Sequence, residues 1–183
     1  FSISASPASL TIQQGGSDSS TITIASLNGY SSGVTLSASV LTGVGTSFLP
    51  NPVTPPAGGS AASILTVSVA ATATPGTYTL TVTGTDGILT HSTPIALSVQ
   101  GKPSPPRNLV ATPGNGKVSL SWQAPLSDGG SPITNYKVYR GTTSGGETLL
   151  ATLGNVLSYT DNSVTNGQTY YYKVSAVNAA GEG

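Results

Sequence analysis

Two stretches decide the fold: NYKVYR at residues 135–140 and YYYKVSAV at residues 170–177. In each, side chains alternate with a period of two, which sends successive side chains to opposite faces of a β-strand. An earlier stretch around Trp122 has the same period. The phase predicted to face a shared core comprises Val118, Leu120, Trp122, Tyr136, Val138, Tyr170, Tyr172, Val174 and Ala176. The second half of the chain is therefore predicted to be built of strands.

The first half shows the same alternation, and no stretch of helix length has a period of 3.6. Turn-rich segments such as Pro55-Pro56 and Pro75-Gly76 separate its apolar runs. These runs are Leu10 and Ile12, Ile22 and Ile24, Val34 to Val40, Leu65 to Val69, Tyr78 to Val82, and Ile95 to Val99. Six or seven short strands with such punctuation indicate a β-sandwich. We expect an all-β protein.

The length and the charge distribution predict two domains. A chain of 183 residues suits two domains of about 90 residues each. Residues 1–100 contain only two charged side chains, Asp18 and Asp86, whereas all six basic residues lie after them. Prolines are concentrated in residues 101–106, where they favour an extended connector. We predict a sandwich over 1–100, a linker over 101–106 and a sandwich over 107–183.

The second half resembles a bacterial fibronectin type III module from about residue 103 to residue 183. Trp122 matches the buried tryptophan of that family and Tyr170 its corner tyrosine, which implies that both are structural. Residues 1–100 resemble a bacterial immunoglobulin-like repeat. There, the Pro-Gly-Thr-Tyr segment ending at Tyr78 is similar to a tyrosine corner, in which a phenol hydrogen-bonds to nearby backbone. The predicted architecture is two tandem β-sandwiches, immunoglobulin-like and then fibronectin type III.

The sequence departs from the fibronectin pattern at its end. The family has a final edge strand after the stretch that contains Tyr172, and here the sequence stops at Gly183. We therefore expect the last strand to be missing, which would leave backbone groups of the preceding strand unpaired. Truncation or proteolysis is the simpler explanation, and addition of a strand from elsewhere is the alternative.

One surface is a candidate for ligand binding. Lys137 and Tyr139 occupy the outward phase of one strand, and Tyr171 and Lys173 that of another. The resemblance implies that these two strands are neighbours, so the four side chains would form one exposed patch. Aromatic rings on such a patch suit stacking with sugars or with a partner protein. The alternative is that tyrosine favours strands and lysine keeps the face soluble.

Composition argues against several other functions. The formal net charge is zero, which disfavours nucleic acid as a partner. There is no cysteine for disulfides or thiolate sites, and no apolar run approaches the ~20 residues of a membrane span. His91 is the single histidine, no Gly-x-Ser-x-Gly motif is present, and most carboxylates lie in turn contexts such as Asp128-Gly129-Gly130 and Asp161-Asn162-Ser163. We expect no catalysis, cofactor or metal.

The resemblance implies that these modules are appended to another domain. Only 7% of the residues are charged, against roughly 25% in an average soluble protein, a composition similar to secreted bacterial β-proteins. We expect a monomeric, non-catalytic accessory or spacer region of a secreted bacterial hydrolase that degrades polysaccharide or protein. A cell-surface stalk or adhesin is one alternative, and a carbohydrate-binding module is another. The expected partners are a polysaccharide or a cell-surface protein.

Overall fold

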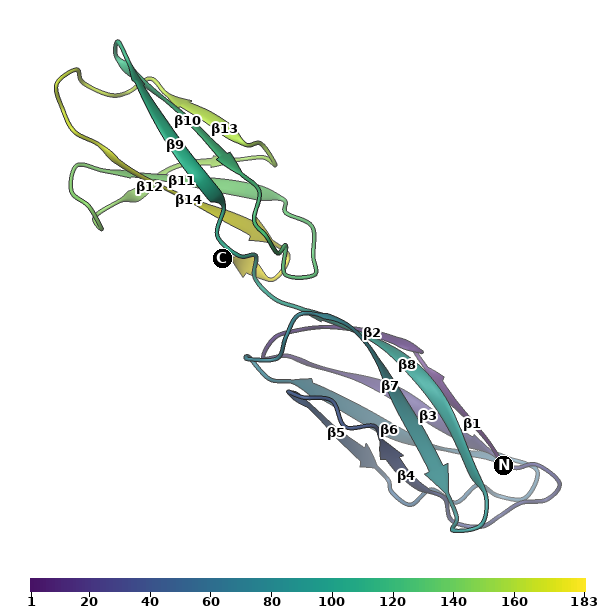
Figure 1. Cartoon of the computed structure of the whole chain (residues 1–183). Helices are drawn as coiled ribbons and strands as arrows, with labels where there is room; N and C mark the ends of the chain where they lie inside the picture. Colours follow the sequence, from purple (N-terminus) through teal and green to yellow (C-terminus); the bar gives the residue numbers. More distant parts are fainter. The chain divides into compact units, whose positions relative to one another are not determined.

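The structure is a computed structural model that describes residues 1–183 (Figure 1). It consists of strands joined by loops and contains no helix. The chain divides into two compact units, residues 1–100 and residues 101–183. Each unit has two sheets and its own core. The predicted all-β fold of two tandem sandwiches is confirmed.

The first unit contains strands β1 to β8 in two four-stranded sheets, ordered β1-β3-β6-β5 and β2-β8-β7-β4. The strands are β1 (Ser2–Ser6), β2 (Ser9–Gln13), β3 (Ser17–Ala25), β4 (Thr35–Ala38), β5 (Val44–Leu49), β6 (Ser60–Val69), β7 (Gly76–Thr85) and β8 (Thr90–Gln100). The first strand of the sandwich is split around Pro7. Its first part, β1, pairs with β3 and its second part, β2, runs parallel to β8, so this segment contributes to both sheets.

The alternation in the first half marks the buried side of each strand. Ile22, Leu65 and Leu97 are fully buried, in phase with other aliphatic side chains of the same strands. Val40 is an exception, because it was predicted to share a strand face with Val34 but is 97% exposed. The reason is that β4 ends at Ala38, where the chain leaves one sheet to enter the other through β5.

Tyr78 lies near the start of β7, half-buried against the first core. Its phenol donates a hydrogen bond to the Thr74 carbonyl oxygen at 2.8 Å. This is the backbone contact expected from the Pro-Gly-Thr-Tyr segment. The tyrosine therefore fixes the entry of the chain into β7.

The second unit contains strands β9 to β15 in two sheets, ordered β13-β10-β9 and β12-β11-β14-β15. The strands are β9 (Arg107–Gly114), β10 (Lys117–Gln123), β11 (Asn135–Gly141), β12 (Thr148–Leu153), β13 (Ser158–Asp161), β14 (Tyr171–Asn178) and β15 (Gly181–Glu182). The core between the sheets comprises the buried residues Leu120, Trp122, Tyr136, Val138 and Ala176. The Trp122 and Tyr136 rings lie 5.6 Å apart and tilted, an arrangement that favours aromatic contact.

Two of the predicted core tyrosines occupy less central positions. Tyr172 is half-buried against the core. Tyr170 precedes β14 and is also half-buried, so the prediction that it lies in the core is corrected. Its phenol oxygen instead accepts a hydrogen bond from the Thr165 N–H at 3.1 Å. The polar end of this ring holds the loop before β14, which explains why it stays at the rim.

The segment predicted to be a linker belongs to the second unit. The Gly101 N–H donates a hydrogen bond to the Gly129 carbonyl oxygen at 2.8 Å. The Ser104 N–H donates one to the Ser127 carbonyl oxygen at 2.9 Å. The buried Asn178 side chain donates to the Gly101 carbonyl oxygen at 2.8 Å. These bonds attach residues 101–104 to the body of the unit, so this part of the predicted linker is not a free connector.

The chain also turns back after β14. Strand β15 pairs with the end of β14, where Val177 lies opposite Glu182 and Asn178 opposite Gly181. The expectation that no strand follows β14 is therefore corrected. The Asn178 side chain accepts a hydrogen bond from the Ala180 N–H at 2.8 Å and so stabilises the turn between the strands.

Candidate functional site

The predicted binding patch lies on paired strands. Strands β11 and β14 are antiparallel neighbours, so Lys137, Tyr139, Tyr171 and Lys173 share the outer face of one sheet. Tyr139 lies opposite Lys173, while Tyr171 lies opposite Gly141. The two tyrosines are therefore diagonal neighbours on this face. Tyr171 is 40% exposed and is the more accessible ring.

Glu182 contacts half of this patch. Its carboxylate accepts hydrogen bonds from Lys137 Nζ at 2.7 Å, from Ser175 Oγ at 2.5 Å and from the phenol of Tyr139. This role of Glu182 does not follow from the sequence pattern, because its position depends on the chain folding back as β15. Lys137 and Tyr139 are thus bound within the unit, whereas Tyr171 and Lys173 are exposed.

These contacts fix the charges of the patch. Hydrogen bonds from Lys137, Ser175 and Tyr139 lower the pKa of the Glu182 carboxyl to about 2. The same carboxylate raises the pKa of Lys137 and of Tyr139. General acid–base catalysis requires a pKa near the working pH. The pKa values of all three groups are shifted away from neutrality, so none of the three is poised for proton transfer near neutral pH.

A groove adjoins the patch, with a volume of about 470 Å³. Its lining includes Tyr139, Glu147, Lys173, Val174, Ser175 and Glu182. Glu147 comes from the loop before β12, where its carboxylate accepts a hydrogen bond from the Gly145 N–H at 3.0 Å. This bond, and to a lesser extent the charge of Lys173, lowers the pKa of Glu147. The groove thus has both positive and negative charges along its wall.

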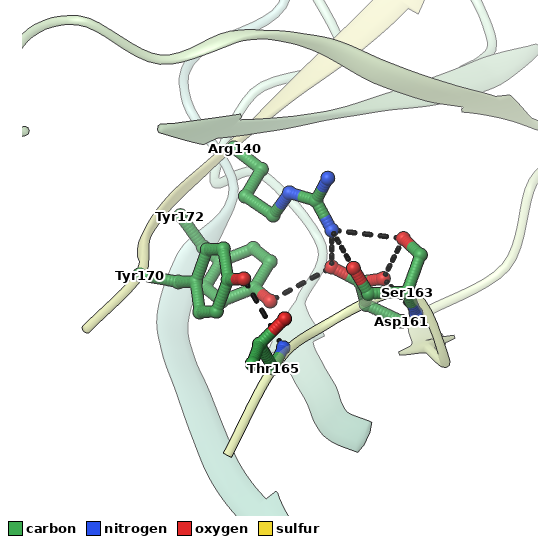
Figure 2. Close-up of polar contacts among 6 residues, drawn as sticks. All are labelled: Arg140, Asp161, Ser163, Thr165, Tyr170 and Tyr172. Atoms are coloured by element: carbon green, nitrogen blue, oxygen red, sulfur yellow. Dashed lines mark hydrogen bonds and ion pairs between the residues drawn. The ribbon is translucent and has the colours of Figure 1, made fainter. Parts of the chain in front are cut away.

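A second polar cluster links the two sheets of this unit (Figure 2). Asp161 ends β13 in one sheet, and its carboxylate accepts hydrogen bonds from Arg140 on β11 and Tyr172 on β14 in the other, each at 2.8 Å. Ser163 also donates to Asp161, through its N–H at 2.9 Å and its hydroxyl at 2.7 Å. The backbone bond is the turn predicted for Asp161-Asn162-Ser163, but the contacts across the sheets were missed.

Asp161 is ionised despite its burial. Its side chain is 1% exposed, and burial alone would raise its pKa. Hydrogen bonds from Ser163, Tyr172 and Arg140 outweigh burial and lower the pKa of Asp161 to about 2. Burial and the Asp161 carboxylate together raise the pKa of Tyr172. The cluster therefore holds a buried ion pair, with a structural role.

Arg140 connects this cluster to Tyr170. Its guanidinium carbon lies 5.2 Å from the centre of the Tyr170 ring, within the range of a cation–π contact. The guanidinium also donates to the Ser163 hydroxyl at 2.8 Å, as Figure 2 shows. Arg140 and Tyr170 thus contact each other, and both also bond the loop after β13. This arrangement orders the loop between the two sheets.

In the first unit, Asp86 and the single histidine, His91, contact different residues. Asp86 accepts hydrogen bonds from the Tyr30 phenol at 2.9 Å and from the Leu89 N–H at 2.7 Å. His91 packs edge-on against Phe1, with 4.9 Å between ring centres. The structure shows no group of three or more His, Cys, Asp or Glu side chains arranged to hold a metal ion. It also shows no helix that is long and apolar enough to cross a membrane.

Comparison with known proteins identifies the class of the second unit. Residues 104–183 match the family model of the fibronectin type III domain. Over 81 residues the chain is 43% identical to an amylopullulanase of Thermoanaerobacterium saccharolyticum, covering 43% of this chain and 6% of that protein. Over 80 residues it is 41% identical to exoglucanase B of Cellulomonas fimi, covering 43% of this chain and 7% of that protein. The second unit is a fibronectin type III domain, a non-catalytic module.

The match to these relatives is limited in length, because the chain spans about 6% of the amylopullulanase. Among solved structures, a crystal structure of titin domains resembles this chain, with a TM-score of 0.55 at 20% identity. It covers 95% of this chain and 57% of the titin chain. At this identity the likeness shows the tandem-sandwich fold alone.

Proposed function

We propose that this chain is a non-catalytic accessory region of a larger, secreted bacterial enzyme that degrades polysaccharide. The observation that carries the proposal is the homology of residues 104–183 to modules within an amylopullulanase and an exoglucanase. In such an enzyme, the module spaces the catalytic domain or brings it to an insoluble substrate. The fixed charges around Glu182 and Asp161 agree with this role, because neither cluster is suited to proton transfer.

The proposal extends to the first unit, which we interpret as an immunoglobulin-like repeat that acts as a second spacer. Its two four-stranded sheets and the backbone contact of Tyr78 support this interpretation. Its surface also supports it, because Asp18 and Asp86 are the only Asp, Glu, Lys or Arg side chains within residues 1–100. Such a unit offers few groups for chemistry.

The test begins with the gene that encodes residues 1–183 and the open reading frame around it. A catalytic domain in the same frame is the expected result. Deleting these residues from the full enzyme should leave kcat on a soluble oligosaccharide unchanged, while hydrolysis of insoluble polysaccharide falls. A reading frame that encodes only further sandwiches and a surface anchor would contradict the proposal and favour a stalk or adhesin.

A further inference from the structure

The two outer faces of the second unit differ in chemistry. The outer face of the β13-β10-β9 sheet presents mainly small hydroxyl side chains, such as Ser121 and Ser158, beside Val110. The outer face of the β12-β11-β14-β15 sheet instead presents aromatic, aliphatic and charged side chains. Across it, Tyr139 lies between Leu149 on β12 and Lys173 on β14. The latter face thus combines an exposed aromatic ring, Tyr171, with charged and hydroxyl side chains.

The accessible part of this face is a short strip. Tyr171 is 40% exposed and Leu149 is 54% exposed. Lys173 follows Tyr171 by two residues on β14, so their side chains project from the same face about 7 Å apart along the strand. The groove with Glu147 and Ser175 in its wall adjoins Lys173. The strip therefore places an aromatic ring beside several hydrogen-bonding groups.

The charges of this strip are balanced. Glu182 pairs with Lys137 at 2.7 Å. Glu147 lies close enough to Lys173 for the two charges to interact. No excess of either sign remains to attract an anionic or a cationic ligand, whereas each group retains capacity for hydrogen bonds to hydroxyls. The charge balance favours a neutral, polar ligand.

The distribution of apolar side chains argues against a protein partner. A stable protein interface buries about 1,200–2,000 Å² around an apolar centre depleted of charge. Here Leu149 and Tyr171 lie on either side of β11, and Tyr139 between them is hydrogen-bonded to Glu182. The charged Lys173 borders the same strip, so the exposed apolar area is small and is not a centre depleted of charge. A sugar ring requires less, namely one aromatic face and hydrogen-bonding groups at its edge.

We propose that Tyr171, Leu149 and the groove beside Lys173 bind a chain of neutral polysaccharide. In this assignment a sugar ring stacks on Tyr171, while Lys173, Glu147 and Ser175 hydrogen-bond its hydroxyls. The assignment rests on the proposed function, to which it adds a substrate class and a site. The assignment also changes the membership of the predicted patch. Lys137 and Tyr139 are left out, because both donate hydrogen bonds to Glu182 of the same unit.

The test measures retention of the 183-residue chain on insoluble starch and on microcrystalline cellulose. The unmodified chain is expected to bind at least one of them at both low and high salt. Tyr171→Ser should weaken binding roughly tenfold by removing the stacked ring, while Tyr171→Phe should retain it. Leu149→Ser should also weaken binding, whereas Val110→Ser should not. Val110 is a matched control, because it is likewise 54% exposed and lies on the outer face of the other sheet.

Several results would overturn the assignment. One is failure of the folded, unmodified chain to bind either glucan, and another is unchanged binding after both Tyr171→Ser and Leu149→Ser. A preference for anionic polygalacturonate that disappears at high salt would contradict a neutral ligand. Each of these results leaves the proposed accessory role standing, because that role is decided by the reading frame and by the deletion in the full enzyme.

Discussion

At the scale of single residues, Asp161 has the largest effect that we predict. Asp161→Ala should destabilise the second unit by about 3 kcal/mol, because it leaves Arg140 and Tyr172 without their buried partner. Denaturant unfolding followed by Trp122 fluorescence measures the effect, since Trp122 is the single tryptophan and lies in this unit. Asp128→Ala is the control, because this exposed carboxylate only caps the Gly130 N–H. Equal losses for the two variants would contradict the role given to Asp161.

Two buried serines in the first unit provide a matched pair. Both are 1% exposed, but Ser20 donates to the Pro7 carbonyl oxygen at 2.7 Å, whereas the Ser63 hydroxyl has no hydrogen-bond partner. Ser20→Ala should cost about 1 kcal/mol, and Ser63→Ala should be neutral or stabilise by about 1 kcal/mol. Thermal unfolding of residues 1–100, followed by circular dichroism, distinguishes the two. A loss of stability in Ser63→Ala would mean that its hydroxyl contributes more than the structure shows.

The residues that the sequence predicted well are those governed by local periodicity. Alternation identified Trp122 and Tyr136 as core because a strand's two faces follow directly from the order of its residues. The contacts of Asp161 and Glu182 did not follow from local order. Asp161 meets Arg140 across 21 positions in the sequence, and Glu182 meets Lys137 across 45. Such pairs depend on which strands become neighbours and on how their ends turn.

At the scale of elements, Asn51 protects an edge of the first unit. Strand β4 is an edge strand, and the Asn51 side chain bonds both backbone groups of Leu36 at 2.9 Å, accepting from its N–H and donating to its carbonyl oxygen. The amide thus replaces a neighbouring strand. Exposed edges with free backbone groups invite association with other chains.

Asn51→Ala should therefore lower the stability of the first unit by about 1–2 kcal/mol and promote self-association. Thermal unfolding measures the first effect, and light scattering of the native chain at increasing concentration measures the second. Asn155→Ala, at an exposed position of the second unit, is the control and should change neither. Unchanged stability and a monomeric state in the Asn51 variant would contradict the edge-protecting role.

At the scale of the whole molecule, the two units concentrate their charges differently. The first contains Asp18 and Asp86, while the second contains all six basic residues and the remaining acids. Sequence composition alone predicted this contrast and the presence of two domains. It did not place residues 101–104 in the second unit, because proline content suggests an extended backbone but cannot show which carbonyls and amides that backbone will meet.

This contrast predicts that acid destabilises the second unit. The folded pKa values of Asp161 and Glu182 are both about 2, below their ordinary values of 3.8 and 4.5. A carboxyl with a depressed folded pKa contributes stability above its unfolded pKa and loses it as the pH falls toward the folded value. The second unit should thus be most stable above about pH 4.5 and weaken progressively toward pH 2. The buried Asp161 should account for roughly 2 kcal/mol of this loss.

The measurement is the free energy of unfolding of the second unit, followed by Trp122 fluorescence across this range of pH. Asp161→Asn should be less stable than the unmodified chain at neutral pH and should show a flatter pH dependence. Glu182→Gln should flatten it less, because its partly exposed carboxylate is screened by solvent. An unfolding free energy that stays constant down to pH 2 would contradict this prediction. It would mean that the two carboxyls have the same pKa in the folded and the unfolded chain.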